Sequence, residues 1–161
     1  MDGRAMEPLT KDHLRHLGTL AAADREDLFT RLPHRAFHRD RVLCVALCQG
    51  AALHWIGGRN GVNDLDVYTF YADGGAMTFP FRRIANAFYR ESGLTAWSER
   101  VDLLGRSIPH VPGGDPVASV VAYLSKPRTP TARELAKKAV VLVEPSERLG
   151  DIIWPVASSR A

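Results

Sequence analysis

Cysteine is scarce in this chain: Cys44 and Cys48 are the only two, and both lie in the apolar run VLCVALC. Two thiols in one hydrophobic segment cannot build a disulfide framework, and buried free thiols suit a reducing compartment. A zinc site needs further ligands at a coordinating spacing, and two cysteines inside an apolar strand argue against one. The sequence therefore predicts free thiols and a cytoplasmic location.

Long apolar runs and charged tails are missing as well. No apolar stretch reaches the roughly 18 residues of a membrane span, and the N-terminal sequence MDGRAMEPLTKDHLRHL is polar, unlike a secretory signal. The 21 Lys and Arg residues are scattered against 18 Asp and Glu, for a net charge of +3. We expect no membrane partner, and this mildly basic balance is compatible with a nucleotide or RNA partner without requiring one.

What the chain does contain is the composition of a globular domain, with 45% hydrophobic and 24% charged residues among 161. That length favours a single domain over residues 1–161. We divide it into N-terminal helices (1–40), a catalytic core (41–108) and C-terminal helices (109–161). The expected fold class is α/β (α+β), with a mixed sheet flanked by helices.

The expected elements follow from apolar periodicity and from Gly and Pro breaks. Helices are predicted from a Thr10 N-cap to Pro33, after Gly50, over 81–93, after Pro116 and after Thr131. Strands are predicted over 42–47, 65–71 and 99–108, with a short edge strand at DIIWP.

The segment NGVNDLDVYTF places two acids, Asp64 and Asp66, at the entrance of an apolar strand. Aspartate is depleted in strands, so this pair calls for a reason. Residues i and i+2 point to the same side of a strand, so both carboxylates can hold a hard divalent cation. The alternative is an ordinary junction between loop and strand, with Asn63 and Asp64 forming Asx turns.

Two further features favour the metal hypothesis. Gly50 stands where an apolar strand meets a helix, and a helix N-terminus behind glycine is a natural phosphate seat. Asp102, in the apolar segment RVDLLG, is a third buried acid that needs a partner. Neighbouring strands lie about 4.8 Å apart, so Asp102 joins the pair if its strand lies beside theirs.

The order GAAL, then DLD, then a later strand aspartate, resembles the nucleotidyltransferase-like superfamily of the DNA polymerase β type. The spelling is most similar to small bacterial AbiE-type toxin nucleotidyltransferases, over residues 42 to about 104. The resemblance implies that Gly50 and Ala51 form the phosphate-binding turn. It also implies that Asp64, Asp66 and Asp102 are catalytic and bind two Mg²⁺ ions, with Asp102 deprotonating the attacking hydroxyl. Ala51 departs from the pattern, because many members have serine there.

A nucleoside triphosphate also needs cationic partners. Arg59, Lys137 and Lys138 are candidates for nucleotide binding. A solvated helix face would explain the two lysines equally well, and an arginine in a glycine-rich loop, like Arg59, is more often an ordinary surface residue. The basic residues Arg82, Arg83 and Arg90 are candidates for RNA contact.

The leading hypothesis is therefore a metal-dependent nucleotidyltransferase acting on an acceptor hydroxyl, with RNA such as a tRNA 3′ end as acceptor and an antitoxin as partner. A protein hydroxyl or a small molecule stays open as the acceptor. The alternatives are a non-catalytic nucleotide- or RNA-binding module of the same fold, and an α/β interaction protein with no metal.

Overall fold

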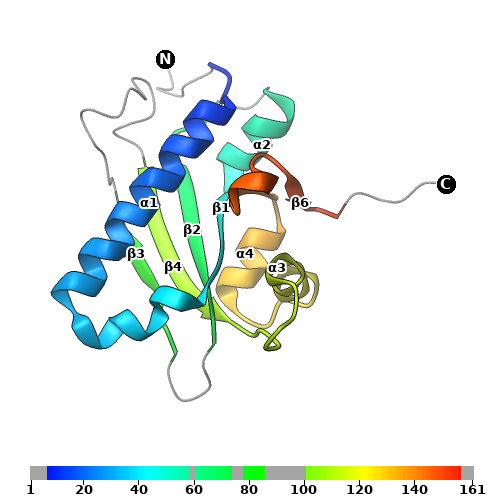
Figure 1. Ribbon diagram of the computed structural model, residues 1–161. Coiled ribbons are helices and arrows are strands. Elements are labelled where there is room, and N and C mark those ends of the chain that lie inside the picture. Colours follow the sequence, from blue (N-terminus) through cyan, green and yellow to red (C-terminus); the bar gives the residue numbers. More distant parts are fainter. Residues whose placement is uncertain (1–6, 59–60, 74–77, 86–100, 157–161) are drawn as a thin grey trace.

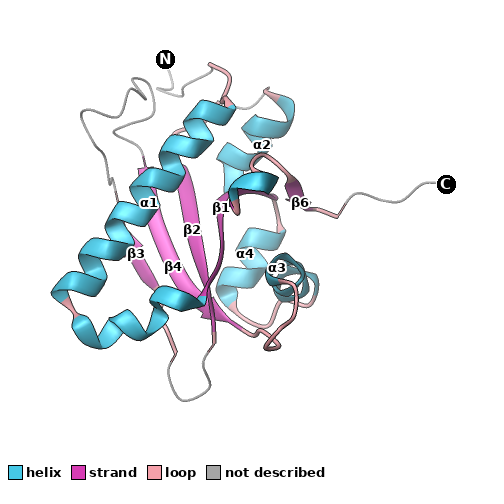
Figure 2. Cartoon of the chain, viewed as in Figure 1, coloured by secondary structure: helices cyan, strands magenta, loops and turns pink. Residues whose placement is uncertain are grey.

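The protein is described here from a computed structural model, which covers residues 7–58, 61–73, 78–85 and 101–156. One six-stranded mixed sheet runs through it, with helices packed on both faces (Figures 1 and 2). The strands are β1 (Val42–Cys48), β2 (Leu65–Ala72), β3 (Arg82–Ile84), β4 (Val101–Ile108), β5 (Ala139–Glu144) and β6 (Ile152–Trp154). The helices are α1 (Lys11–Arg31), α2 (Gln49–Gly57), α3 (Pro116–Ser125) and α4 (Pro130–Ala136), with the 3₁₀ turns η1 (Pro33–Arg41) and η3 (Ser146–Arg148).

The strand order is β3-β4-β2-β1-β5-β6, and only the β2–β4 pairing is parallel. Because β1 is antiparallel to both β2 and β5, its last residue lies at the end of the sheet where β2 and β5 begin. Since β4 is parallel to β2, it begins at this end too. The turn into α2 and the first residues of β2, β4 and β5 therefore lie together at the same end of the strands.

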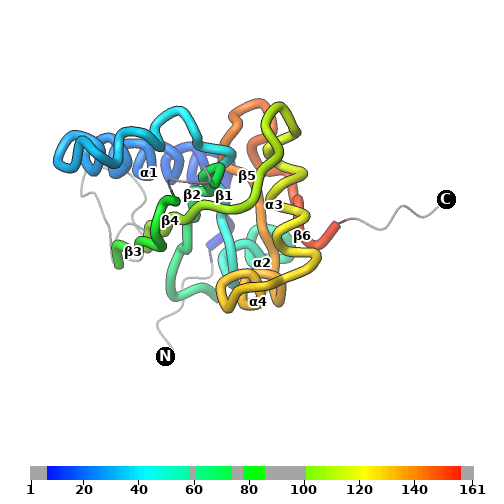
Figure 3. Tube along the Cα trace, turned by 90° about the horizontal axis from the view of Figure 1, so that it is seen from below, coloured from blue at the N-terminus to red at the C-terminus, as the bar shows by residue number. Residues whose placement is uncertain are grey.

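Side-chain alternation along the central strands builds two separate cores. Val45 and Leu47 of β1 pack with Leu14 and Leu17 of α1 on one face. On the other face, the intervening residues of β1 pack with residues of α3, a group made up of Cys44, Ala46, Cys48, Val120 and Leu124. Viewed along the sheet, α1 lies on one side and α3 and α4 lie on the other (Figure 3). Both cysteines are free and buried, and burial raises the pKa of the Cys44 thiol to about 12.

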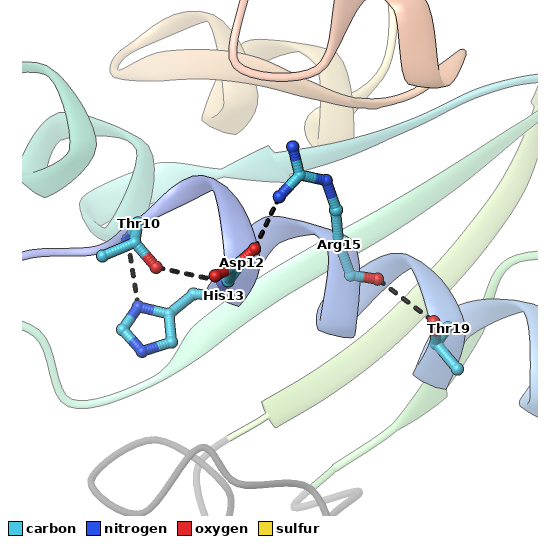
Figure 4. A network of polar contacts seen from close by, with 5 residues as sticks. All are labelled: Thr10, Asp12, His13, Arg15 and Thr19. Carbon is cyan, nitrogen blue, oxygen red and sulfur yellow. Dashed lines mark hydrogen bonds and ion pairs between the residues drawn. The ribbon is translucent and has the colours of Figure 1, made fainter.

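The N-terminus of α1 is closed by a reciprocal cap at the predicted residue, Thr10. The His13 backbone N–H donates to Thr10 Oγ1 at 3.2 Å, and the Thr10 N–H donates to His13 Nδ1 at 3.0 Å (Figure 4). This arrangement satisfies two N–H groups that the first turn of a helix leaves without partners. Among the described residues, no helix has the length and apolar character that a membrane span needs.

The predicted mixed sheet flanked by helices is confirmed. The strands predicted over 42–47 and 65–71 are confirmed to within one residue at each end, and the strand predicted over 99–108 is confirmed from Val101 to Ile108, while residues 99–100 lie outside the described residues. The prediction of a helix over 81–93 is wrong at its start, because Arg82–Ile84 forms strand β3 on the edge of β4. Arg82 and Arg83 consequently point to opposite faces, where they meet Asp24 of α1 and Asp102 of β4 respectively. Residues 86–93 of that predicted helix lie outside the described residues.

The division into C-terminal helices over 109–161 is also wrong in part, because β5 and β6 complete the sheet there. The segment after Thr131 does not continue as one helix. α4 starts at Pro130 behind the N-cap Thr129, ends at Ala136, and gives way to the fully apolar strand AVVLV. A run of β-branched residues buried on both faces favours a strand over a helix, and the local capping pattern could not reveal this.

We predict that Gly18→Ala destabilises the protein. A Cβ at Gly18 would lie 2.9 Å from Cγ1 of the buried residue Val143, so α1 could keep its contact with β5 only by shifting. Overpacking costs about 1–3 kcal/mol, against about 1 kcal/mol gained in helix propensity. Urea unfolding should show a net loss of about 1 kcal/mol.

Gly57→Ala is the matched control, because a Cβ there meets nothing within 4 Å. It should leave the free energy of unfolding unchanged or slightly raised. Equal effects of the two substitutions would contradict the close contact between α1 and β5.

Candidate functional site

The parallel pairing of β2 with β4 places Asp66 directly beside Asp102. Both side chains point to the α3 and α4 face, the face that Tyr68 and Phe70 of β2 also occupy. Asp102 is only 3% exposed, whereas Asp66 is half-buried. The expectation that Asp102 lies on the strand adjacent to the acidic pair is therefore confirmed.

Asp64 stands one residue before β2 and is exposed, so it belongs to the loop that enters the strand. It lines the same cleft as Asp66, whose volume is about 420 Å³. The cleft is bordered by the turn into α2, the loop before β2 and the residue before β5. Its lining residues are Gln49, Gly50, Leu53, Gly61, Val62, Asn63, Asp64, Asp66 and Lys138.

The turn from β1 into α2 brings uncapped backbone N–H groups to this cleft. Gln49 has φ 62°, a left-handed conformation that non-glycine residues rarely adopt, and no side chain caps the helix at Cys48. A Cβ at Gly50 would meet nothing within 4 Å, so the fold itself does not require glycine there. An unusual backbone conformation of this kind costs about 1–3 kcal/mol and is found preferentially at ligand sites.

Ala51 was expected to share the phosphate-binding role, but its side chain is 1% exposed and packs in the α1 core. It does not line the cleft. Any contact of this residue with a ligand would therefore have to come from its backbone. His54, on the same helix, is 1% exposed, and its Nε2 donates to the Glu7 carbonyl oxygen at 2.7 Å, which makes it a packing residue.

The surroundings of Asp66 change its protonation. Burial raises the pKa of Asp66 to about 6, and the charges of Asp102 and then Asp64 add to this effect. The cations Arg83 and Lys138 act in the opposite direction on the Asp66 pKa. The three acids therefore form one electrostatic unit with a cation on each side.

Arg83, from the edge strand β3, reaches across to the buried acid. Its Nη2 donates to Asp102 Oδ2 at 2.8 Å, while the Arg83 side chain stays 56% exposed. Arg82, the other half of the predicted RNA-binding pair, instead forms an ion pair with Asp24. The two arginines thus have different surroundings, and only Arg83 belongs to the acidic site.

The two predicted lysines also separate. Lys138, just before β5, lines the cleft, whereas Lys137 does not line it and donates to Glu134 Oε1 at 2.9 Å on the surface. The expectation that Lys137 contacts the ligand is therefore not supported by its position. Arg59 and Arg90 lie outside the described residues.

The donor chemistry of the site suits a hard cation, because three carboxylates supply only oxygen ligands. Within the part of the chain that the structure describes, however, no group of three or more His, Cys, Asp or Glu side chains converges into a ready-made metal site. Asp64 is exposed in a loop and Asp102 is held by Arg83. A metal ion would thus need the carboxylates to draw together around it.

Comparisons of the chain with known protein-family models, with curated proteins and with solved structures give no match. The case for function therefore depends on the site itself.

The sequence does not predict two polar residues that line the cleft, Gln49 and Asn63. The sequence predicts only a turn role for Asn63, although its position directly before Asp64 is itself a reason to expect it at the site. Gln49 carries no sequence signal, since its left-handed backbone conformation is more typical of glycine.

We predict that Asp66→Asn stabilises the folded protein at alkaline pH. The Asp66 pKa of about 6 in the folded state exceeds the ordinary value of 3.8, so ionisation of this residue opposes folding above about pH 6. Protonated Asp66 contributes to the free energy of unfolding at low pH, and this contribution is lost as the pH rises through 6. After allowance for solvent screening, the variant should be more stable by about 1 kcal/mol at pH 8.

The measurement is urea unfolding of both proteins at pH 8 and pH 4.5, where the difference should shrink. Asp40→Asn removes the same charge from the exposed surface of η1 and is the control. An equal gain at both pH values, or an equal gain from the control, would contradict the assignment.

Proposed function

We propose that the protein is a metal-dependent nucleotidyltransferase, which moves a nucleotidyl group from a nucleoside triphosphate to an acceptor hydroxyl. The observation that supports this most is the pairing of Asp66 with Asp102 beside a cleft that also contains Asp64 and the start of α2. The start of α2, the carboxylates and Lys138 lie at one end of the central strands. This combination suits a ligand that is polyanionic and accompanied by Mg²⁺.

In the proposed reaction, an acceptor oxygen forms a bond to the α-phosphorus while the bond to the β-phosphate oxygen breaks, and pyrophosphate leaves. The N–H groups at Gly50 and the positive end of α2 would bind phosphate oxygens. Asp102 would take the acceptor proton on a carboxylate oxygen. Mg²⁺ held by Asp64, Asp66 and Asp102 would lower the barrier by neutralising charge on the transferred phosphoryl group.

RNA, including a tRNA 3′ end, is the proposed acceptor, and a toxin paired with an antitoxin is the proposed context. The mildly basic net charge of +3 is compatible with a nucleic-acid partner. The second candidate is a non-catalytic nucleotide-binding module. The ion pair between Arg83 and Asp102 favours it, because a neighbouring cation makes a carboxylate a weaker base.

We predict that Asp64→Asn and Asp66→Asn each abolish transfer from a labelled nucleoside triphosphate to RNA. Each substitution removes a charged oxygen ligand while keeping the side-chain shape, so transfer should fall at least about 100-fold with folding retained. The assay supplies all four triphosphates with Mg²⁺ and sequences RNA 3′ ends for added nucleotides.

Circular dichroism and urea unfolding of the same preparations check that folding is kept. Transfer that persists in both variants would contradict the metal assignment. Calorimetric binding of a triphosphate to the wild-type protein, with no transfer to any acceptor tested, would favour the binding module.

We also predict that Lys138→Gln weakens triphosphate binding while Lys137→Gln does not. Lys138 lines the cleft, whereas the adjacent Lys137 is paired with Glu134, so the two substitutions change net charge equally at neighbouring positions. Loss of one partially solvated phosphate contact should raise the dissociation constant about 5- to 10-fold.

Isothermal titration with ATP and Mg²⁺ measures both variants. Equal weakening by the two substitutions would point to a general charge effect, and no weakening by either would place the phosphates elsewhere.

A further inference from the structure

The ion pair between Arg83 and Asp102 competes with the binding of a metal cation at Asp102. The proposed function makes Asp102 a metal ligand, yet Asp102 Oδ2 accepts a hydrogen bond from Arg83 Nη2 at 2.8 Å. A guanidinium and a divalent cation bound to the same carboxylate repel each other at this range, so each weakens the binding of the other. Binding of a cation at Asp102 is therefore favoured when Arg83 moves away.

Arg83 is placed so that it can move. Its side chain is 56% exposed, whereas the Asp102 side chain is only 4% exposed. It extends from β3, a three-residue strand whose one partner among the described residues is β4. The fold thus fixes the position of Asp102, whereas the Arg83 guanidinium can leave it and be solvated by water at low cost.

A structural role for this ion pair fits the surroundings less well. The other cross-element ion pair of β3, between Arg82 and Asp24, has both side chains largely buried, at 18% and 16% exposure. An ion pair that holds β3 to the body of the protein is therefore already present on the opposite face. Arg83 instead adds positive charge beside the acidic unit of Asp64, Asp66 and Asp102.

We propose that Arg83 is a positioning residue that controls cation entry, because it neutralises Asp102 in the free protein and yields this carboxylate to the incoming metal ion. This inference rests on the proposed function, which makes Asp102 a metal ligand. Free cations compete with Arg83 and bind weakly. A cation that arrives with a nucleoside triphosphate brings phosphate oxygens, to which a planar guanidinium can transfer its hydrogen bonds.

The test is the affinity for Mn²⁺ alone, measured by the electron paramagnetic resonance signal of the free ion at pH 8 and low ionic strength. Arg83→Gln keeps an N–H donor for Asp102 and removes the charge, so Mn²⁺ should bind at least about 10-fold more tightly. Arg83→Lys keeps the charge but loses the fork geometry, and should tighten binding only about 2- to 3-fold.

Arg31→Gln is the matched control. Its side chain is also 56% exposed and also forms an ion pair with an aspartate, Asp27 on the surface of α1. It should leave the Mn²⁺ affinity unchanged. A second control uses Asp102→Asn, because adding Arg83→Gln to that variant should no longer tighten Mn²⁺ binding.

Unchanged or weaker Mn²⁺ binding by Arg83→Gln would overturn the proposal, and so would equal tightening in the Asp102→Asn background. If Arg83→Gln fails to fold, Arg83→Lys decides, with unchanged affinity as the contradicting result. The transfer assay separates this inference from the proposed function. Tighter Mn²⁺ binding without any transfer would overturn only the enzyme activity, and transfer with an unchanged Mn²⁺ affinity in Arg83→Gln would overturn only the role of Arg83.

Discussion

The parallel pairing of β2 with β4 is the constraint on which the candidate site depends. It runs in register from Leu65 beside Val101 to Ala72 beside Ile108, and its second step is the pair of Asp66 and Asp102. A slip of one residue would send one carboxylate to the opposite face of the sheet. The antiparallel strands β1 and β5 complete the site, because β1 ends and β5 begins at the end of the sheet where β2 and β4 start.

The same pairing creates an electrostatic problem that the neighbouring strands reduce. Burial raises the pKa of Asp66 to about 6, and repulsion from Asp102 on the adjacent strand and from nearby Asp64 adds to this effect. In the order of the strands across the sheet, Arg83 of β3 lies on one side of the acids and Lys138 before β5 lies on the other. The acids are kept at a cost in stability, which is the usual pattern where a binding site and a folding core compete for the same residues.

The sequence was sufficient to predict the central elements and the acidic residues, since apolar runs bounded by glycine identify β1 and β2 and an acid within such a run is unusual. It could not predict β3, where Phe81 and Ile84 have helical spacing and only the pairing with β4 makes a strand. It also could not separate Lys137 from Lys138, because both follow α4 and the difference depends on which side chain meets the cleft. The link between Arg83 and Asp102 joins residues 19 positions apart through sheet topology, which no local pattern encodes.

The alanine at position 51 matters less to the site than the sequence alone suggests. In the sequence, alanine at this position departs from the serine expected from the resemblance to nucleotidyltransferases, and this departure counts against the proposed catalysis. In the fold, the Ala51 side chain is buried in the α1 core and the cleft is lined by Gln49 and Gly50. The phosphate seat at the start of α2 would consist of backbone N–H groups, whose positions are set by the left-handed turn at Gln49 and not by the side chain at position 51. The stronger obstacle to the proposed catalysis is then the ion pair at Asp102, because a carboxylate paired with Arg83 is a weaker base than a free one.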